Sequence, residues 1–246
     1  MHNPTTLSLD GLVNFRELGG ITTAHGTIRH GVLFRSESVS DLSEVGRQDL
    51  ASSRIQTVID LRSKAEVQRA PGLATDSLTP RLVALPLLDG AMPTSVTQLP
   101  TLETIYQQLV SESGAAFARA AGTVADADGG VLIHCTAGKD RTGLAVALTL
   151  LAVGADLDQV RADYLVSSQH LAGAWAERML AGARAHGVEI PDTEAARELI
   201  FGTSQIAFDK AVERVQNDFG SAEAYLLKHG LLDVQLERLN SRLVES

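Results

Sequence analysis

The sequence predicts an α/β fold in which helices flank a central, mostly parallel sheet and the C-terminal half is rich in helix. Short apolar runs bounded by Gly, Pro, Ser or Asp recur in the first half, at residues 32–35, 57–61, 82–87 and 131–134. These runs are continuously apolar, which is typical of strands covered on both faces, and the longer helical patterns between them indicate βα units. Helical spacing of apolar residues then dominates the second half.

The helices are predicted from apolar spacing and from the residues that end each segment. One helix is expected from Thr101 to about Ala125. An apolar segment from Gly143 to Val153 indicates a buried helix, which Gly154 ends before Asp156 starts the next as its N-cap. Stripes of apolar residues predict two later helices, one with Phe208, Ala211, Val212 and Val215, the other with Leu236, Leu239 and Leu243.

We expect residues 1–246 to form one domain, because the chain has no internal repeat, low-complexity tract or linker rich in Pro, Gly or Ser. Between Ser168 and Phe201 the helical pattern weakens. That segment is either a helical flap or a peripheral helical hairpin, and the sequence favours the hairpin.

Composition excludes several classes of protein. With 21 Lys and Arg against 30 Asp and Glu, the net charge of −9 argues against a nucleic-acid or anionic-membrane binder. Cys135 is the single cysteine, and the seven histidines form no HExxH pair, so neither a disulfide nor a structural metal is expected.

The N-terminal segment and the apolar runs indicate where in the cell the protein is expected. Met1 to Asp10 is polar, lacks a basic start and is followed by no apolar stretch of the signal-peptide type, so we expect a cytoplasmic protein; export without a recognisable signal is the alternative. The longest apolar run, Gly143 to Ala155, is shorter than the roughly 20 residues that span a bilayer, so no transmembrane segment is expected.

Residues 134–143, His-Cys-Thr-Ala-Gly-Lys-Asp-Arg-Thr-Gly, follow a predicted strand and open the buried helix. A strand that turns abruptly into a helix leaves a loop whose backbone N–H groups converge with the helix N-terminus, which favours an anion such as phosphate. The predicted phosphate-binding residues are Thr136, Ala137, Gly138, Lys139, Asp140 and Arg141.

The side chains of this loop suit phosphoryl transfer. The helix N-terminus and the neighbouring cations favour a thiolate at Cys135, which makes it the candidate nucleophile. Arg141 can bind two phosphoryl oxygens with its planar fork, and the Thr142 hydroxyl can donate to the sulfur. Lys139 is expected to add a second cation at the rim, which suits polyanionic ligands such as phosphoinositides.

Two other interpretations of the loop are weaker. A nucleotide-binding P-loop requires GxxxxGK[ST], whereas Lys139 is followed by Asp140. A lone cysteine is usually an inert core thiol, but an inert thiol leaves the spacing of Gly138, Arg141 and Thr142 unexplained.

The loop resembles the C-x5-R-[ST] signature of the cysteine-dependent protein tyrosine phosphatases. Its Gly-Lys-Asp-Arg-Thr-Gly variant is similar to the atypical bacterial branch close to the mycobacterial secreted phosphatases, which acts on phosphotyrosine, phosphoserine or phosphothreonine, and phosphoinositides. Other segments agree with that family: residues 14–20 (NFRELGG), 34–36 (FRS), 58–63 (VIDLRS) with Glu66, and 163–165 (DYL).

The resemblance implies a phosphatase-type sheet flanked by helices, with Cys135 as nucleophile, Arg141 as phosphate clamp, Thr142 assisting, and no cofactor. The implied substrate is a phosphorylated protein or a phosphoinositide. The alternative is a pseudophosphatase module that binds phosphate without turnover, although binding alone would tolerate loss of Cys135. A rhodanese or arsenate reductase places its cysteine loop differently.

Two aspartates compete as the general acid that protonates the leaving group. Asp89 follows the predicted strand at 82–87, where many tyrosine and dual-specificity phosphatases place their acid. Asp140 lies inside the loop, where bound phosphate would repel a carboxylate and favour its protonated form; the resemblance to the atypical branch also favours Asp140.

Several polar residues near the expected site have two interpretations. Asp60 and Arg62 end a strand that should adjoin the catalytic strand, so they either shape the pocket or form a salt bridge that organises loops. Arg16 and Arg35 have the same two interpretations. His134 is expected to organise the loop and not to act as a base.

Overall fold

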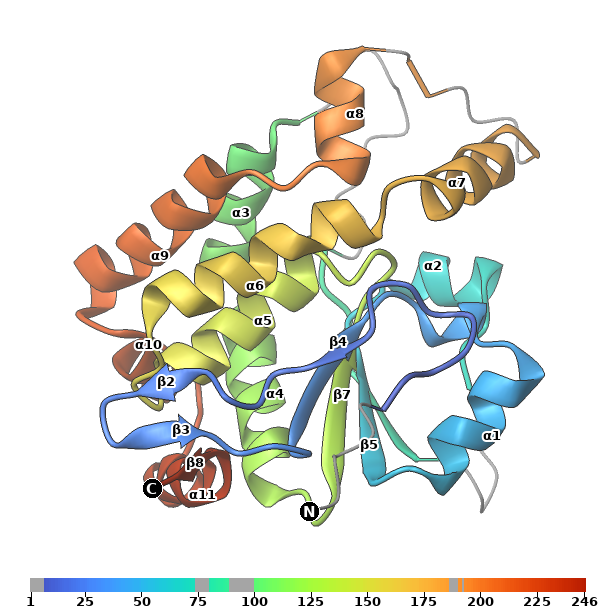
Figure 1. The fold of residues 1–246 in the computed structure, drawn as a ribbon. Helices are drawn as coiled ribbons and strands as arrows, with labels where there is room; N and C mark the ends of the chain where they lie inside the picture. The colour runs from blue at the N-terminus through green and yellow to red at the C-terminus, as the bar shows by residue number, and fades with distance from the viewer. Residues whose placement is uncertain (1–6, 74–79, 89–99, 186–189, 192) are drawn as a thin grey trace.

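The central sheet has five strands and is mostly parallel, as the sequence predicts. The computed structural model describes residues 7–73, 80–88, 100–185, 190–191 and 193–246 (Figure 1). Neighbouring strands are parallel except at the β1 edge. Across the sheet the order is β1 (Arg16–Glu17), β4 (Leu33–Ser36), β7 (Gly130–His134), β5 (Ile55–Asp60) and β6 (Arg81–Ala84).

The register brings the carboxyl ends of the parallel strands to one edge of the sheet. Ser36 at the end of β4 and Asp60 at the end of β5 both lie opposite His134, the last residue of β7. Cys135 therefore follows the central strand at the edge where α/β sheets place their ligands.

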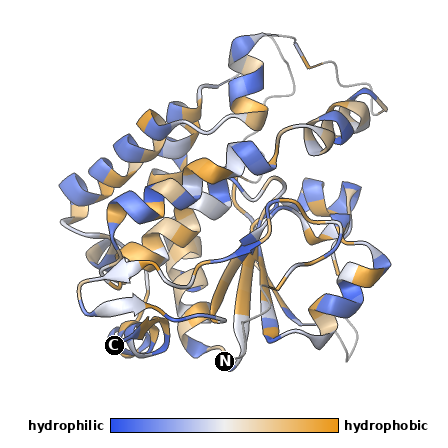
Figure 2. Cartoon of the chain, in the orientation of Figure 1, coloured by the Kyte–Doolittle hydropathy of each residue, from blue (hydrophilic) through white to orange (hydrophobic). Residues whose placement is uncertain are grey.

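The three central strands are rich in buried apolar residues because both faces of the sheet are covered. Leu33 and Ile133 point into the larger core, beneath α3 to α6, whereas Phe34 and Leu132 point into a smaller core that includes Leu50 of α1. Figure 2 shows the three central strands in hydrophobic colours between these layers. Continuous apolar runs are the pattern expected of such strands.

The described residues contain eleven α-helices and one short 3-10 helix, and helices dominate the chain after β7. They are α1 (Glu44–Ser52), α2 (Lys64–Arg69), α3 (Leu102–Glu112), α4 (Gly114–Asp126), α5 (Asp140–Leu151), α6 (Leu157–His170), α7 (Ala174–Ala185), α8 (Glu194–Phe201), α9 (Gln205–Phe219), α10 (Ala222–Lys228), α11 (Asp233–Leu243) and η1 (Val39–Asp41).

The helix predicted from Thr101 to Ala125 is two helices, which corrects the sequence interpretation. The break falls at Ser113, which ends α3 and precedes α4. Serine and glycine are poor helix formers, and a Cβ at Gly114 would lie 2.2 Å from the ring of His229. The close approach of this ring therefore requires glycine at the junction.

The N-cap and glycine signals of the second half are confirmed. Asp156 accepts a hydrogen bond from the Gln159 N–H at the start of α6, and Gly154 before it has a φ of 76°. A separate three-stranded antiparallel sheet joins β2 (Thr22–Thr23), β3 (Gly26–Ile28) and β8 (Val244–Glu245).

The segment Ser168–Phe201 contains α7 and α8, which lie beyond the carboxyl edge of the sheet (Figure 1). The Trp175 ring in α7 meets Phe201 at the end of α8 edge to face, with ring centroids 6.3 Å apart. The two interpretations of this segment, as a peripheral hairpin or as a flap, stay predictions, as does the single-domain organisation. None of the described helices is both long and apolar enough to cross a membrane.

Candidate active site

Cys135 lies directly after β7 and is 2% exposed. Its burial at the carboxyl edge agrees with either a core thiol or a shielded nucleophile, so the surrounding loop must separate the two interpretations. The loop spans residues 136–139 and leads into α5, whose first residue is Asp140.

The loop carbonyls are bound by the protein, whereas the loop N–H groups are not. The carbonyl of Thr136 accepts from the Ser38 N–H, and that of Gly138 accepts from the Arg35 guanidinium. The carbonyl of Ala137 accepts from the Asn14 amide. None of the N–H groups of residues 136–141 donates to another group in the described part of the chain. Such a loop turns its acceptors outward and keeps its donors for an anion.

Gly138 makes this turn sterically accessible. Its φ is 66°, in the left-handed region, and a Cβ at this position would lie 2.0 Å from the carbonyl oxygen of Ser36. Only glycine satisfies both constraints.

A buried ion-pair network supports the loop from the β4 side. Arg35, 1% exposed, binds Asp163 of α6 at 2.5 Å through Nη1 and the Gly138 carbonyl at 2.7 Å through Nη2. Arg16 binds the other oxygen of Asp163 and also the Asn14 side chain, which bonds the loop. Burial opposes ionisation of Asp163, but the two arginines hold its pKa below its ordinary value. Arg16 and Arg35 therefore organise the loop.

Arg141 is held by a carboxylate that the sequence interpretation did not assign. Its Nη1 and Nη2 donate to the two oxygens of Glu66 at 2.6 and 2.7 Å. Burial acts to lower the pKa of Arg141, but the charges of Cys135 and Glu66 raise it above the ordinary arginine value. The bidentate pair fixes the plane of the guanidinium fork, which is the property that phosphoryl binding requires.

Glu66 is itself positioned by two groups besides Arg141. It completes a capping box at the start of α2, accepting from the Ser63 N–H at 2.8 Å, and it accepts from the Thr136 hydroxyl in the loop. The S-x-x-E spacing of the capping box is visible in the sequence, but nothing in it signals contact with a residue 75 positions away.

Lys139 does not lie at the rim, which corrects the expected placement of its side chain. The residue is 0% exposed, and its Nζ donates to the carbonyls of Leu199 at 3.0 Å and Gly202 at 2.5 Å, at the end of α8. The C-terminal carbonyls of a helix lack intrahelical partners and carry partial negative charge, so they attract an ammonium group.

The carboxylate of Asp140 faces two donors. Its Oδ1 accepts from the Tyr106 hydroxyl at 3.0 Å, and its Oδ2 lies 3.5 Å from Nζ of Lys139. Burial and the Asp140 charge raise the pKa of Tyr106, so this phenol keeps its proton and acts as a donor. Tyr106 was not identified from the sequence, because an apolar-spaced tyrosine in a helix is indistinguishable from a core residue.

The two remaining catalytic candidates differ in what can be said of them. The Thr142 hydroxyl is buried without a hydrogen-bond partner among the described residues, so the expected bond to the Cys135 sulfur is not formed in this structure. Asp89 lies outside the described residues.

His134, Asp60 and Arg62 form a buried group beneath the loop. Arg62 binds Asp60 through Nε and Nη2, the latter at 2.8 Å, which agrees with the salt-bridge interpretation. The Nδ1 of His134 lies 3.2 Å from the Cys135 carbonyl. Burial lowers the pKa of His134, which favours a neutral ring, as expected for a residue that organises the loop.

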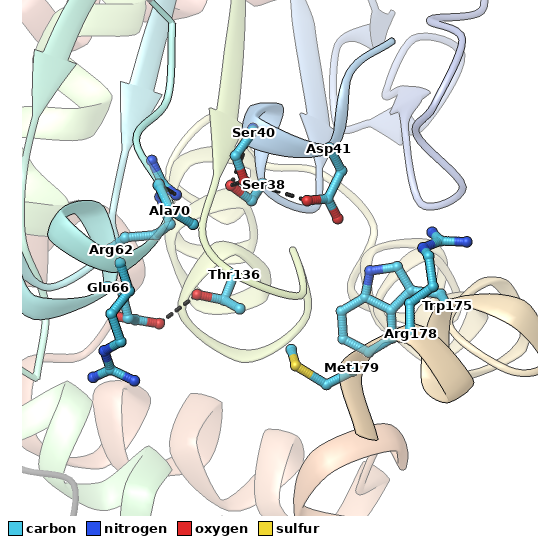
Figure 3. A pocket seen from close by; sticks show the side chains of 11 residues that line it. Ser38, Ser40, Asp41, Arg62, Glu66, Ala70, Thr136, Trp175, Arg178 and Met179 are labelled. Carbon is cyan, nitrogen blue, oxygen red and sulfur yellow. Dashed lines mark hydrogen bonds between the residues drawn. The ribbon is translucent and has the colours of Figure 1, made fainter. Parts of the chain in front are cut away.

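A cavity of about 250 Å³ opens beside the loop (Figure 3). Its walls come from η1, α2, the loop and α7, and residues of both charges and three apolar side chains line it. Thr136 and Glu66 form the wall nearest the loop.

Comparisons with known proteins agree with this geometry. The tyrosine phosphatase family is matched over residues 7–245. The triple specificity protein phosphatase PtpB of Mycobacterium tuberculosis is 30% identical over 278 residues, covering 96% of this chain and 98% of that protein. A tyrosine-protein phosphatase of Nostoc commune is 27% identical over 217 residues, covering 85% of this chain and 73% of its own length.

Among solved structures, TpbA of P. aeruginosa matches 64% of this chain and 81% of its own at 20% identity, with a TM-score of 0.28, which is too low to carry an argument. The family match does not depend on that likeness, because it spans nearly the whole sequence, including the loop and the residues that support it. The chain belongs to the tyrosine phosphatase family.

Proposed function

We propose that this phosphatase hydrolyses phosphomonoesters through a phosphocysteine at Cys135. The observation that carries the proposal is the loop itself: its carbonyls are bound outward, its N–H groups have no partner among the described residues, and Glu66 fixes Arg141 just after it. An equatorial cradle of N–H donors with a planar cation stabilises the charge that spreads over the oxygens of a transferring phosphoryl group.

In the first step the Cys135 sulfur attacks phosphorus, and the bond from phosphorus to the leaving oxygen breaks as that oxygen takes a proton. Asp140 is the proposed donor, positioned by Tyr106, with Asp89 as the alternative. In the second step water attacks the phosphocysteine and gives its proton to the same carboxylate. The sulfur leaves as a thiolate, to which the Thr142 hydroxyl, which has no partner in the described part of the chain, can donate.

The proposed substrates are phosphotyrosyl proteins, with phosphoserine, phosphothreonine and phosphoinositides as further classes. The name of the M. tuberculosis relative, a triple specificity protein phosphatase, supports this breadth. A pseudophosphatase is not favoured, since recognition alone would not need the buried thiol together with the fixed Arg141.

Phosphate release from matched phosphotyrosyl, phosphoseryl and phosphothreonyl peptides and from phosphoinositides tests the proposal, with Cys135→Ser as the blank. We expect release by the wild type only, while the variant keeps its affinity for phosphate. Release by Cys135→Ser at a comparable rate would remove Cys135 as the nucleophile.

The pH profile of kcat/KM identifies the general acid. A donor must be protonated, so activity should fall as pH rises through its pKa in the free enzyme. Asp140→Asn should remove this basic limb; if Asp89→Asn removes it and Asp140→Asn does not, the assignment passes to Asp89.

A further inference from the structure

We propose that the cavity beside the loop binds a second phosphate of the substrate, carried on an inositol ring, through Arg69 and Arg178. This inference rests on the proposed function, because it concerns a substrate whose other phosphate occupies the Cys135 loop. The inference predicts a preference for headgroups with more than one phosphate and assigns that preference to residues outside the loop.

The cavity adjoins the phosphate loop directly. Thr136, the residue after Cys135, and Glu66, which binds Arg141, both line it. Figure 3 shows Trp175, Arg178 and Met179 on the side opposite Glu66, with Thr136 between them. A ligand with one phosphate in the loop therefore extends past Thr136 into this space.

The cavity offers two guanidinium groups that no described residue binds. Arg62 is committed to Asp60 and to the Ala70 carbonyl. Arg69 and Arg178 are exposed and have no hydrogen-bond or ion-pair partner within the described ranges. Because the Lys139 ammonium is buried at the end of α8, Arg69 and Arg178 are, among the described residues that line the cavity, the cations positioned for a second anion.

The remaining lining favours a compact ring over an extended peptide. At about 250 Å³ the cavity is smaller than the roughly 300 Å³ or more of typical ligand clefts, so it suits a single rigid group. Trp175 and Met179 supply an apolar wall, and the Ser38 and Ser40 hydroxyls can bond ring hydroxyls. Asp41 also lines the cavity and opposes a second phosphate by charge repulsion.

The test compares a short-chain phosphatidylinositol monophosphate with the bisphosphate that carries the same scissile phosphate. We expect the wild type to prefer the bisphosphate by about tenfold in kcat/KM, the effect of one charge-assisted contact. Arg69→Gln and Arg178→Gln should each reduce this ratio, and the double variant should bring it near one. Asp41→Asn should raise it, because the repulsive charge is removed.

Arg119→Gln, an exposed arginine of α4, is the matched control and should leave the ratio unchanged. Equal ratios in the wild type and the double variant would overturn the inference while leaving the phosphatase intact. An arginine-dependent preference for doubly phosphorylated peptides alone would overturn the inositol assignment. If no substrate, including p-nitrophenyl phosphate, releases phosphate in a Cys135-dependent manner, the proposed function itself fails.

Discussion

Lys139 at the end of the loop and Arg141 in the first turn of α5 are two positions apart, but their side chains bind partners in different regions of the molecule. Arg141 is bound by Glu66 of α2, the helix that follows β5. Lys139 is bound by the carbonyls of Leu199 and Gly202, in the peripheral helical region. Both are basic residues in one motif, yet Arg141 donates to a carboxylate, whereas the hydrogen bonds of Lys139 go to backbone carbonyls and the Asp140 carboxylate lies farther away, at 3.5 Å.

The difference between these two sets of partners indicates different roles for Arg141 and Lys139. A carboxylate with two oxygens fixes the plane of a guanidinium, and the capping box fixes the carboxylate in turn. The Lys139 ammonium is a point charge, so its contacts with backbone carbonyls do not fix the plane of a side-chain group, but they do connect α8 to the loop. We infer that Arg141 serves the chemistry and that Lys139 serves the attachment of α8.

The largest effect is expected from replacing Arg141 by lysine. Charge is kept, but the planar fork that binds both Glu66 and phosphoryl oxygens is lost. We expect kcat to fall about a hundredfold to a thousandfold, the loss typical of removing a transition-state donor. Steady-state kinetics on p-nitrophenyl phosphate measure it, with Arg119→Gln as the control. Near-normal turnover would contradict the clamp role.

A smaller effect is expected from Glu66→Gln, which keeps the size of the side chain but removes its charge. Misplacement of the Arg141 fork should lower kcat by about tenfold to a hundredfold, with less change in KM. Glu103→Gln, at a half-buried glutamate of α3 that pairs with Lys210 away from the loop, serves as the matched control. A change confined to KM would place Glu66 in substrate binding and not in positioning.

The effect of Glu66→Gln on the stability of the protein should depend on pH. Burial opposes ionisation of Glu66, but Arg141 lowers its pKa well below the ordinary value of 4.5. A group with a depressed pKa contributes stability that is fully present above its unfolded value and is lost as pH falls through the folded value. The difference in urea midpoint between wild type and Glu66→Gln should thus be widest near pH 7 and narrow below pH 4.5.

The smallest effect on turnover is expected from Lys139→Met, which keeps the length and removes the ammonium. Loss of hydrogen bonds from a charged donor, about 1.5–3 kcal/mol, should make proteolysis within residues 168–201 at least tenfold faster. Turnover should change by less than tenfold. Lys210→Met, an exposed lysine of α9, is the control. An unchanged rate of proteolysis would contradict the proposed role of Lys139 in holding α8 to the loop.

Contiguous features of the chain could be predicted because their physics is local. Strand β7, the turn at Gly138 and helix α5 follow from adjacent residues, as do the capping residues Ser63 and Asp156. The break at Ser113 was missed, although serine and glycine are poor helix formers. The reason that position 114 requires glycine, the approach of the His229 ring, comes from a distant segment.

The sequence by itself determined the α/β class, the phosphatase loop with Cys135 and Arg141, and the order of the elements around them. Only the tertiary structure decided which groups these residues meet: Glu66 at Arg141, Tyr106 at Asp140, and the end of α8 at Lys139. The physical reason is that backbone preference and burial patterns are encoded over a few residues. The direction of a long charged side chain is instead chosen by whichever oxygens the folded chain brings within reach.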